Sequence, residues 1–287
     1  MLDTANSPPA IDPDFERIVT GPDSEINLAE AALLIARVEY PQLDIDYYLA
    51  FLDDMATIIA AQLPPHCPRL QVLGQINHYL FNEQGYSGNL HHFLDPRNSF
   101  LNDVLERKLG IPISLSLVYM EIGQRLGLPI AGVSFPGHFL IKLPGEEDDI
   151  VLDPFAGGVS LDGPDLKRRL QHVKSVSTEQ LMAKLPELLR PASNKAILVR
   201  MLRNLKSIYS NSGDRLRMMR VLNYLLAVSP DEVDELKARA ELYEQMQCYR
   251  AALDDFERVS LLTRQPGESH ELAMRCMRLR QRSQMLH

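Results

Sequence analysis

The order of the hydrophobic periodicities along this chain constrains its fold more than any other feature of the sequence. From residue 27 to Gly127, apolar residues recur at the spacing of helices, and Gly or Pro ends the stretches. Three short strand-like runs then follow at 130–134, 138–143 and 149–152. A run of helices followed by a small meander predicts an α+β fold, rich in helix and with a small antiparallel sheet.

Strand signals disappear beyond about residue 190, and a spacing of about 34 residues takes their place. Two successive units place small, apolar and aromatic residues where paired helices need them: Tyr209, Met218, Leu222, Leu225 and Pro230, then Leu236, Ala240, Tyr243, Ala252 and Phe256. This pattern resembles the tetratricopeptide repeat, so we expect an all-α domain at 191–287 that ends in a cap helix. The rest of the chain divides into a flexible N-terminal segment at 1–24 and the α+β domain at 25–190.

Composition narrows the class of protein. Of 287 residues, 45% are hydrophobic, and no run approaches the ~18–20 apolar residues that a membrane span needs. The acidic, Pro-rich N-terminus lacks the basic start and apolar centre of a signal peptide, which predicts a cytoplasmic protein. The formal net charge of −8 argues against general binding to nucleic acid. Cys67, Cys248 and Cys276 lie far apart without metal-ligand spacing, so neither a disulfide nor a metal or other cofactor is expected.

The stretch FPGHFLIKLPGEEDDIVLDPF predicts a hairpin that carries a histidine and an aspartate. With a loop at 144–147, His138 falls opposite Asp153 and Lys142 opposite Asp149, so each pair shares one side of the sheet. An imidazole beside a carboxylate forms the base and its orienting group in nucleophilic sites. The histidine–aspartate pair is therefore a candidate for a catalytic site, for a ligand site or for a hydrogen bond that orders the hairpin.

The segment GIPISLSLVYMEIGQRLGLPIAGVSFPGHFLIKL and the following VLDPFAGG resemble the transglutaminase-like core of the papain-like superfamily. That resemblance implies a cysteine at the start of a buried helix, a histidine on one strand and an aspartate on the next. His138 and Asp153 match the family's histidine and aspartate. A gap-free count back from Gly127 puts Pro112 at the position of the cysteine, and proline supplies no nucleophile.

A longer block, DPRNSFLNDVLERKLGIPISLSLVYMEIGQRLGLPIAGVSFPGHFLIKL, together with the repeats behind it resembles the bacterial SirB-type family. Its members join a transglutaminase-like domain to tetratricopeptide repeats, are associated with regulation, and generally have no assigned chemistry. The resemblance implies that the proline at the cysteine position is a family trait.

Three other side chains are candidates for the missing nucleophile. Ser114 lies in the first turn of the helix that begins at Pro112, about 200° around the helix from that position. We expect its hydroxyl to satisfy a backbone group in that turn. Ser116 points to roughly the opposite side of the helix from Ser114, and Cys67 reaches the site only through tertiary folding.

A polar cluster, Asn98, Ser99 and Asn102, stands at the start of another predicted helix. Asn98 or Ser99 fits an N-cap there, and the alternative is that the cluster forms a binding wall beside His138. The neighbouring histidines at 91–92 lie in a loop where adjacent side chains point apart, so no metal site is predicted from them.

The leading functional prediction is a non-catalytic regulatory or protein-interaction module whose helical repeats bind a protein partner. That prediction expects an exposed patch on the repeats with basic and aromatic members: Arg217, Arg220, Tyr224 and Arg239. The alternative is a hydrolase or acyltransferase of amide or ester bonds, in which Ser114 or an activated water attacks, His138 is the base and Asp153 orients it. The enzyme needs a nucleophilic oxygen within about 3.5 Å of the His138 ring.

Overall fold

The computed structural model describes residues 11–145, 148–173, 176–263 and 266–285. Contacts divide the described chain into two compact units. The larger unit spans 22–201, and the smaller unit combines the described parts of 1–21 and 202–287. The division therefore falls inside one long helix, α10 (Asn194–Ser212), whereas the predicted boundary lay at 190.

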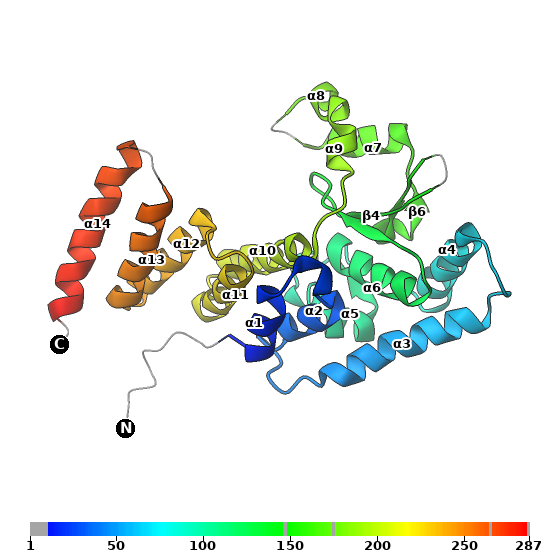
Figure 1. Ribbon diagram of the computed structural model, residues 1–287, viewed down its shortest axis with the longest axis horizontal. Helices are drawn as coiled ribbons and strands as arrows, with labels where there is room; N and C mark the ends of the chain where they lie inside the picture. The colour runs from blue at the N-terminus through cyan, green and yellow to red at the C-terminus, as the bar shows by residue number, and fades with distance from the viewer. Residues whose placement is uncertain (1–10, 146–147, 174–175, 264–265, 286–287) are drawn as a thin grey trace. The chain divides into compact units, whose positions relative to one another are not determined.

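The larger unit has the helix-rich composition that the periodicities predicted, with small sheets (Figure 1). Its elements in chain order are η1 (Asp23–Glu25), α2 (Leu28–Ala36), α3 (Ile45–Ala61), α4 (Arg69–Asn77), η2 (His78–Glu83), β1 (Ser87–Gly88), η3 (Pro96–Asn98), α5 (Leu101–Arg107), β2 (Leu109–Gly110), α6 (Pro112–Arg125), β3 (Ala131–Val133), β4 (Leu140–Leu143), β5 (Ile150–Asp153), η4 (Pro154–Ala156), β6 (Val159–Ser160), α7 (Gly163–Leu170), α8 (Thr178–Ala183), α9 (Leu185–Leu188) and the start of α10.

Local chemistry sets the ends of these helices. The Asn27 side chain accepts a hydrogen bond from the Glu30 amide at the start of α2, and Asp44 does the same for the Tyr47 amide at the start of α3. Pro112 occupies the first turn of α6, where its missing amide hydrogen and fixed φ fit a helix start. Most of the circumference of α6 is buried, as its apolar sequence predicted.

Strands β3, β4, β5 and β6 form an antiparallel meander in that spatial order. Leu143 pairs with Ile150 and Ile141 with Leu152, so the β4–β5 connection is two residues longer than predicted and the predicted register is wrong. A shift of two residues keeps every side chain on its original face, since side chains alternate with a period of two. The Lys142–Asp149 ion pair consequently forms at 2.6 Å even though the two residues are not direct partners.

Both faces of this sheet are covered. Figure 1 shows α6 on one side of the sheet and α7, α8 and α9 on the other. A cluster of buried apolar residues joins the sheet to α7 and α8: Val133, Phe135, Leu140, Val151, Leu161, Leu166, Leu170 and Leu181. Burial on two faces explains why the short strands are apolar at consecutive positions.

The smaller unit contains α1 (Pro13–Thr20), the end of α10, α11 (Arg215–Val228), α12 (Val233–Gln245), α13 (Tyr249–Leu262) and α14 (Pro266–Met285). Residues that the repeat pattern placed between paired helices are buried there: Leu236, Ala240, Tyr243, Ala252 and Phe256. The final helix, α14, packs on α13 and buries Leu272, Cys276 and Leu279. The second predicted unit and its cap helix thus have the packing expected of stacked repeats.

Helix α1 lies within the segment that the sequence predicted to be flexible. Asp12 caps the helix, Pro13 begins it, and Phe15 and Val19 are buried. The Phe15 ring packs against the Tyr224 ring of α11 with centroids 4.5 Å apart. The cap, the proline and the apolar spacing of four residues together are a helix signal that the composition of the surrounding segment obscured.

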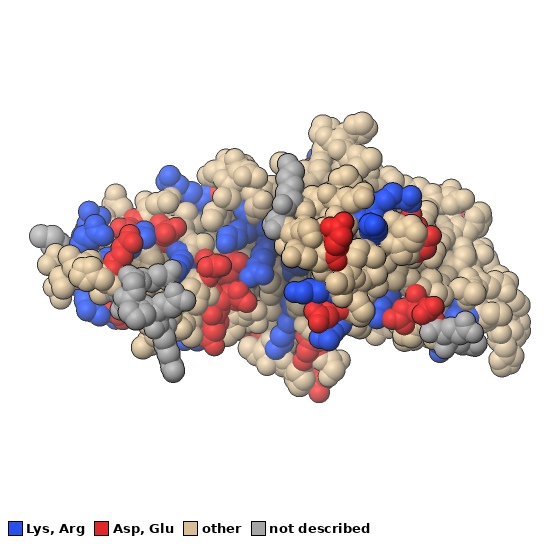
Figure 2. Space-filling view, turned by 90° about the horizontal axis from the view of Figure 1, so that it is seen from above, with Lys and Arg blue, Asp and Glu red and all other residues tan. Residues whose placement is uncertain are grey.

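The surface carries charges of both signs. In the view of Figure 2, Lys and Arg side chains are interspersed with Asp and Glu side chains. Among the described residues, no helix has the length and hydrophobicity to cross a membrane.

Candidate functional site

His138 lies in the turn between β3 and β4. Gly137, immediately before it, has φ +69°, a left-handed conformation that glycine adopts without steric cost. The His138 amide donates to the Phe135 carbonyl at 3.1 Å, which closes the turn. From α10, the Arg200 guanidinium donates to the carbonyls of His138 at 2.5 Å and Phe135 at 3.3 Å. The backbone that carries the imidazole is therefore fixed from two sides.

Asp153 ends β5 and is almost completely buried, with 1% of its surface exposed. Its Oδ1 lies 2.9 Å from His138 Nε2 and also accepts from the amides of Phe155 and Ala156, at 3.0 and 3.3 Å. Its Oδ2 accepts from the Arg169 guanidinium of α7 at 2.6 Å. Both oxygens of this carboxylate thus accept hydrogen bonds, as a buried charge requires.

Electrostatics keep Asp153 ionised. Burial raises the pKa of Asp153, but the hydrogen bonds and positive charge of His138 and Arg169 outweigh it, and its pKa lies below the usual range. Because an ionised carboxylate only accepts hydrogen bonds, Nε2 of His138 carries a hydrogen. In the neutral imidazole, Nδ1 is then the atom with an available lone pair. Among the described residues, no hydrogen-bond partner of Nδ1 is found.

The predicted nucleophiles do not meet this histidine. The hydroxyl of Ser114 is fully buried, accepts from the Ile111 amide at 3.0 Å and donates to the Asn98 carbonyl at 2.6 Å. Ser114 therefore satisfies backbone groups at the start of α6, as expected of it. The Cys67 thiol contacts the Pro68 carbonyl at 3.7 Å, in the connection between α3 and α4. Across the described ranges, no hydroxyl or thiol forms a hydrogen bond with His138.

Two known protein families match successive parts of this chain. The model of the transglutaminase-like superfamily matches residues 46–203, and a tetratricopeptide repeat model matches residues 205–277. A UPF0162 protein of Xylella fastidiosa (strain Temecula1) is 38% identical over 247 residues, which cover 86% of this chain and 87% of that protein. The chain is a UPF0162 member of the transglutaminase-like superfamily.

More distant relatives match a shorter part of the chain. F-box only protein 21 of Homo sapiens is 32% identical over 185 residues, 60% of this chain and 28% of that protein. Protein SirB1 of Salmonella typhimurium is 29% identical over 157 residues, 54% of this chain and 56% of that protein. The resemblance to the SirB-type family is thereby confirmed. No solved structure matches the chain.

The start of α6 is the position at which the resemblance to the transglutaminase-like core implies a cysteine. Pro112 is the first residue of that helix, and Ile111 precedes it as the N-cap. A helix N-terminus stabilises a thiolate, but a proline there offers neither a side-chain nucleophile nor an amide hydrogen. The candidate site therefore consists of the His138–Asp153 pair supported by Arg169 and Arg200.

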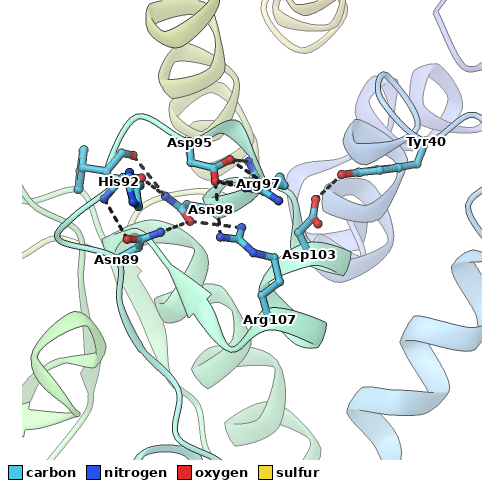
Figure 3. Close-up of polar contacts among 9 residues, drawn as sticks. Tyr40, Asn89, His92, Asp95, Arg97, Asn98, Asp103 and Arg107 are labelled. Carbon is cyan, nitrogen blue, oxygen red and sulfur yellow. Dashed lines mark hydrogen bonds and ion pairs between the residues drawn. The ribbon is translucent and has the colours of Figure 1, made fainter.

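The polar cluster at the start of α5 is organised differently from the prediction. Phe100 is the N-cap of α5 and no side chain caps the helix, so the predicted N-cap role of Asn98 and Ser99 is wrong. Asn98 instead turns back to the preceding loop, where it bonds the His92 carbonyl (Figure 3). Ser99 Oγ and Asn102 Oδ1 are buried, and neither has a hydrogen-bond partner in the described part of the chain.

The four residues predicted to form a patch on the repeats lie in different environments. Tyr224 is 4% exposed, packs against Phe15 and accepts a hydrogen bond from the Asp12 amide, so its predicted exposure is wrong. Arg239 forms two hydrogen bonds with Asp255, at 2.7 and 2.8 Å, inside the unit.

The other two members of the predicted patch are basic residues of α11. Arg217 is half-exposed and pairs with Asp214 at 2.7 Å, and Arg220 is exposed. Of the predicted patch, the two arginines of α11 are the most exposed members, and Arg239 has about one fifth of its side chain exposed. The aromatic member and Arg239 stabilise the fold instead.

Three supporting residues of the site were not predicted. Arg169 belongs to a run of three basic residues, and nothing in that run distinguishes the member that reaches Asp153. Arg200 approaches the His138 turn from a helix that is distant in sequence. The Phe155 ring contacts the His138 ring edge-on, with centroids 5.9 Å apart, and its position directly after the DP motif was the available signal.

Among the described residues, no cluster of three or more His, Cys, Asp or Glu side chains is arranged to hold a metal ion. The histidines at 91–92 belong to an exposed loop.

Proposed function

We propose that this chain is a non-catalytic regulatory protein of the cytoplasm that binds a protein partner through its tetratricopeptide repeats. One observation supports the first part of the proposal: Pro112, which the resemblance places at the cysteine position, begins α6, and the nearest hydroxyl along the chain, that of Ser114, is hydrogen-bonded to backbone groups. Its three cysteines are free thiols in the structure, which is consistent with a reducing compartment.

The repeat unit supplies the surface for the partner. Two depressions lie in this unit. The first, of about 230 Å³, is lined by α10, α11 and α12, and the second, of about 160 Å³, by α12, α13 and α14. The α12 residue Glu241 lines both depressions, so they adjoin each other. Tetratricopeptide repeats commonly present such a concave surface to a protein partner. The patch proposed from the sequence is replaced by this one, because two of its four members are engaged within the fold.

A variant that fills the depression tests the proposal. Ala238 of α12 lines the first depression, and Ala238→Arg places a long side chain there with little loss of helix propensity. Ala251→Arg on α13 is the matched control, since Ala251 lines neither depression. The full chain is used as bait in a crosslinking pull-down from the source cells.

We expect the wild-type chain, Ala251→Arg and His138→Ala to retain the same partner, and Ala238→Arg to lose it. Circular dichroism checks that all variants are folded. A partner retained equally by Ala238→Arg would place its binding elsewhere and would contradict the proposal.

A second candidate function rests on the His138–Asp153 hydrogen bond of 2.9 Å, which is the arrangement of a base and its orienting group. In that reading the chain hydrolyses an amide or ester bond, with water activated by His138 Nδ1 as nucleophile. A screen of amide and ester substrates decides between the two functions. A turnover that His138→Ala abolishes and Ala238→Arg leaves intact would replace the non-catalytic assignment.

A further inference from the structure

The loop at 89–95, between β1 and η3, exposes three large apolar side chains. Leu90 is 74% exposed, Phe93 48% and Leu94 57%. Together with β1, Arg97, Arg107 and Leu109 they line a depression of about 1100 Å³. Single exposed apolar residues are ordinary, but several that line one concavity indicate a binding surface. We call this depression and the loop beside it the 89–95 surface.

Hydrogen bonds fix the conformation of this loop, and its apolar side chains are exposed in that conformation. The side-chain Nδ2 of the buried Asn98 donates to the His92 carbonyl at 2.7 Å, and its Oδ1 accepts from Asn89 Nδ2 at 3.1 Å (Figure 3). Asn89 in turn accepts from the His92 amide at 3.1 Å. The Asn98 carbonyl accepts from Ser114, which ties the loop to the start of α6. A loop fixed by buried hydrogen bonds does not collapse to hide its apolar side chains.

The lining carries more positive than negative charge. Asp95 accepts from the Arg97 guanidinium at 2.8 Å and lies 3.5 Å from the Arg107 guanidinium, so one carboxylate is shared by two cations. The hydrogen bond from Arg97 holds the pKa of Asp95 below its usual range, which keeps that carboxylate charged at neutral pH. Asp103 also interacts electrostatically with both arginines, but it is buried and does not line the depression. The lining itself therefore keeps one positive charge in excess, which favours an acidic group in a bound molecule.

The surface adjoins the histidine site. The Phe93 ring meets the Phe155 ring edge-on at 6.4 Å, and Phe155 meets His138 edge-on at 5.9 Å. Gly88 of β1 lets Phe155 approach, because a Cβ there would lie 2.5 Å from the ring. A molecule seated on the 89–95 surface therefore contacts Phe93, whose ring packs against the aromatic residue that touches the imidazole.

We propose that the 89–95 surface binds an extended peptide segment of a protein partner, in which a carboxylate stands beside a large apolar side chain. A peptide fits better than a lipid surface because the apolar side chains line a concavity, whereas a membrane needs a projecting apolar face. This surface is separate from the depressions of the repeats and takes its own ligand.

The test selects peptides from a random displayed heptapeptide library on the immobilised full chain. The enriched peptides are synthesised with a fluorophore, and their affinities are measured by fluorescence anisotropy. We expect them to share an acidic residue next to Leu, Ile or Phe. Phe93→Ser is expected to weaken their binding about tenfold or more, as loss of an aromatic anchor does. Arg97→Gln is expected to weaken binding and to reduce its dependence on salt.

Two controls separate this proposal from other effects. Ile58 of α3 is comparably exposed but lies outside the depression, so Ile58→Ser should leave peptide affinity unchanged. Ala238→Arg should also leave it unchanged, so the failure of this proposal is distinguishable from failure of the repeat surface. Hydrogen exchange over residues 86–98 checks that the loop of each variant stays ordered.

Three outcomes would overturn the proposal. One is a library selection that enriches no shared sequence, and another is a set of peptides that bind Phe93→Ser and the wild type equally. The third is sedimentation of the wild-type chain with phosphatidylglycerol vesicles that Phe93→Ser abolishes, since the surface would then recognise lipid.

Discussion

The carboxylate of Asp153 should be the most sensitive polar group of the histidine site. Its Oδ1 accepts three hydrogen bonds and its Oδ2 accepts one from Arg169. In Asp153→Asn, one of the two oxygens becomes an amide group that only donates. Whichever way the amide is oriented, a donor then faces another donor, either Arg169 or the imidazole and the backbone amides.

The size of the effect follows from these contacts. A hydrogen bond to a charged group contributes about 1.5–3 kcal/mol, and the Arg169 side chain is about one quarter exposed, so water relieves part of the loss. We expect the free energy of local opening to fall by about 2 kcal/mol, which corresponds to about 30-fold faster exchange. Asp149→Asn is the matched control, because the carboxylate of Asp149 is about half-exposed and its pair with Lys142 should contribute at most about 0.5 kcal/mol.

Hydrogen exchange of the amides in β4 and β5, followed by mass spectrometry, measures this change without assuming that both units unfold together. The same experiment has a pH dependence. The pKa of Asp153 is depressed in the folded protein, so the carboxylate stabilises the fold above its unfolded-state pKa of about 3.9. That stabilisation is lost as the pH falls through the folded-state pKa, and Asp153→Asn lacks the loss. Equal exchange rates in Asp153→Asn and Asp149→Asn would refute the reasoning.

Three further changes test packing around the two units. Phe256→Ala should lower the free energy of unfolding of the repeats by about 3–5 kcal/mol, whereas Leu261→Ala, on the same helix but exposed, should change it by less than about 0.5 kcal/mol; urea unfolding monitored by circular dichroism compares them. Arg200→Gln removes the donors of two carbonyls and should speed exchange in the turn that holds the histidine by an amount equivalent to about 1–3 kcal/mol, with Arg200→Lys intermediate. Gly88→Ala should reduce the free energy of unfolding by an overpacking cost of about 1–3 kcal/mol, because the new methyl group meets the Phe155 ring. The thermal midpoint should fall accordingly, and an unchanged midpoint in a calorimetric scan would contradict that contact.

Sequence patterns predicted the parts of this protein that depend on local periodicity. The buried α6, the meander and the second repeat unit follow from apolar spacing, which acts over one or two turns. The histidine–aspartate contact was predicted from a register that is wrong by two residues, and it survives because a shift of two preserves the face. The face of the sheet was therefore more predictable than the length of the turn.

Contacts between distant segments were beyond such patterns. Tyr224 lies among basic residues of a helix, which predicts exposure, yet it is buried and Phe15 of α1 packs against it. Arg169 and Arg200 reach the site from helices whose own sequences do not encode their destination. Asn98 sits at a helix start, yet its side chain satisfies the loop before it, since two routes to a hydrogen bond compete there.

The four donors around Asp153 have a consequence for how related chains are interpreted. A carboxylate that closes a strand end, a short helix and a neighbouring arginine is useful to the fold whether or not any reaction takes place beside it. Its histidine, as one of the four donors, serves the fold in the same way. In a genome survey, a His and an Asp at these positions therefore indicate the architecture of this strand end, and they say nothing by themselves about catalysis.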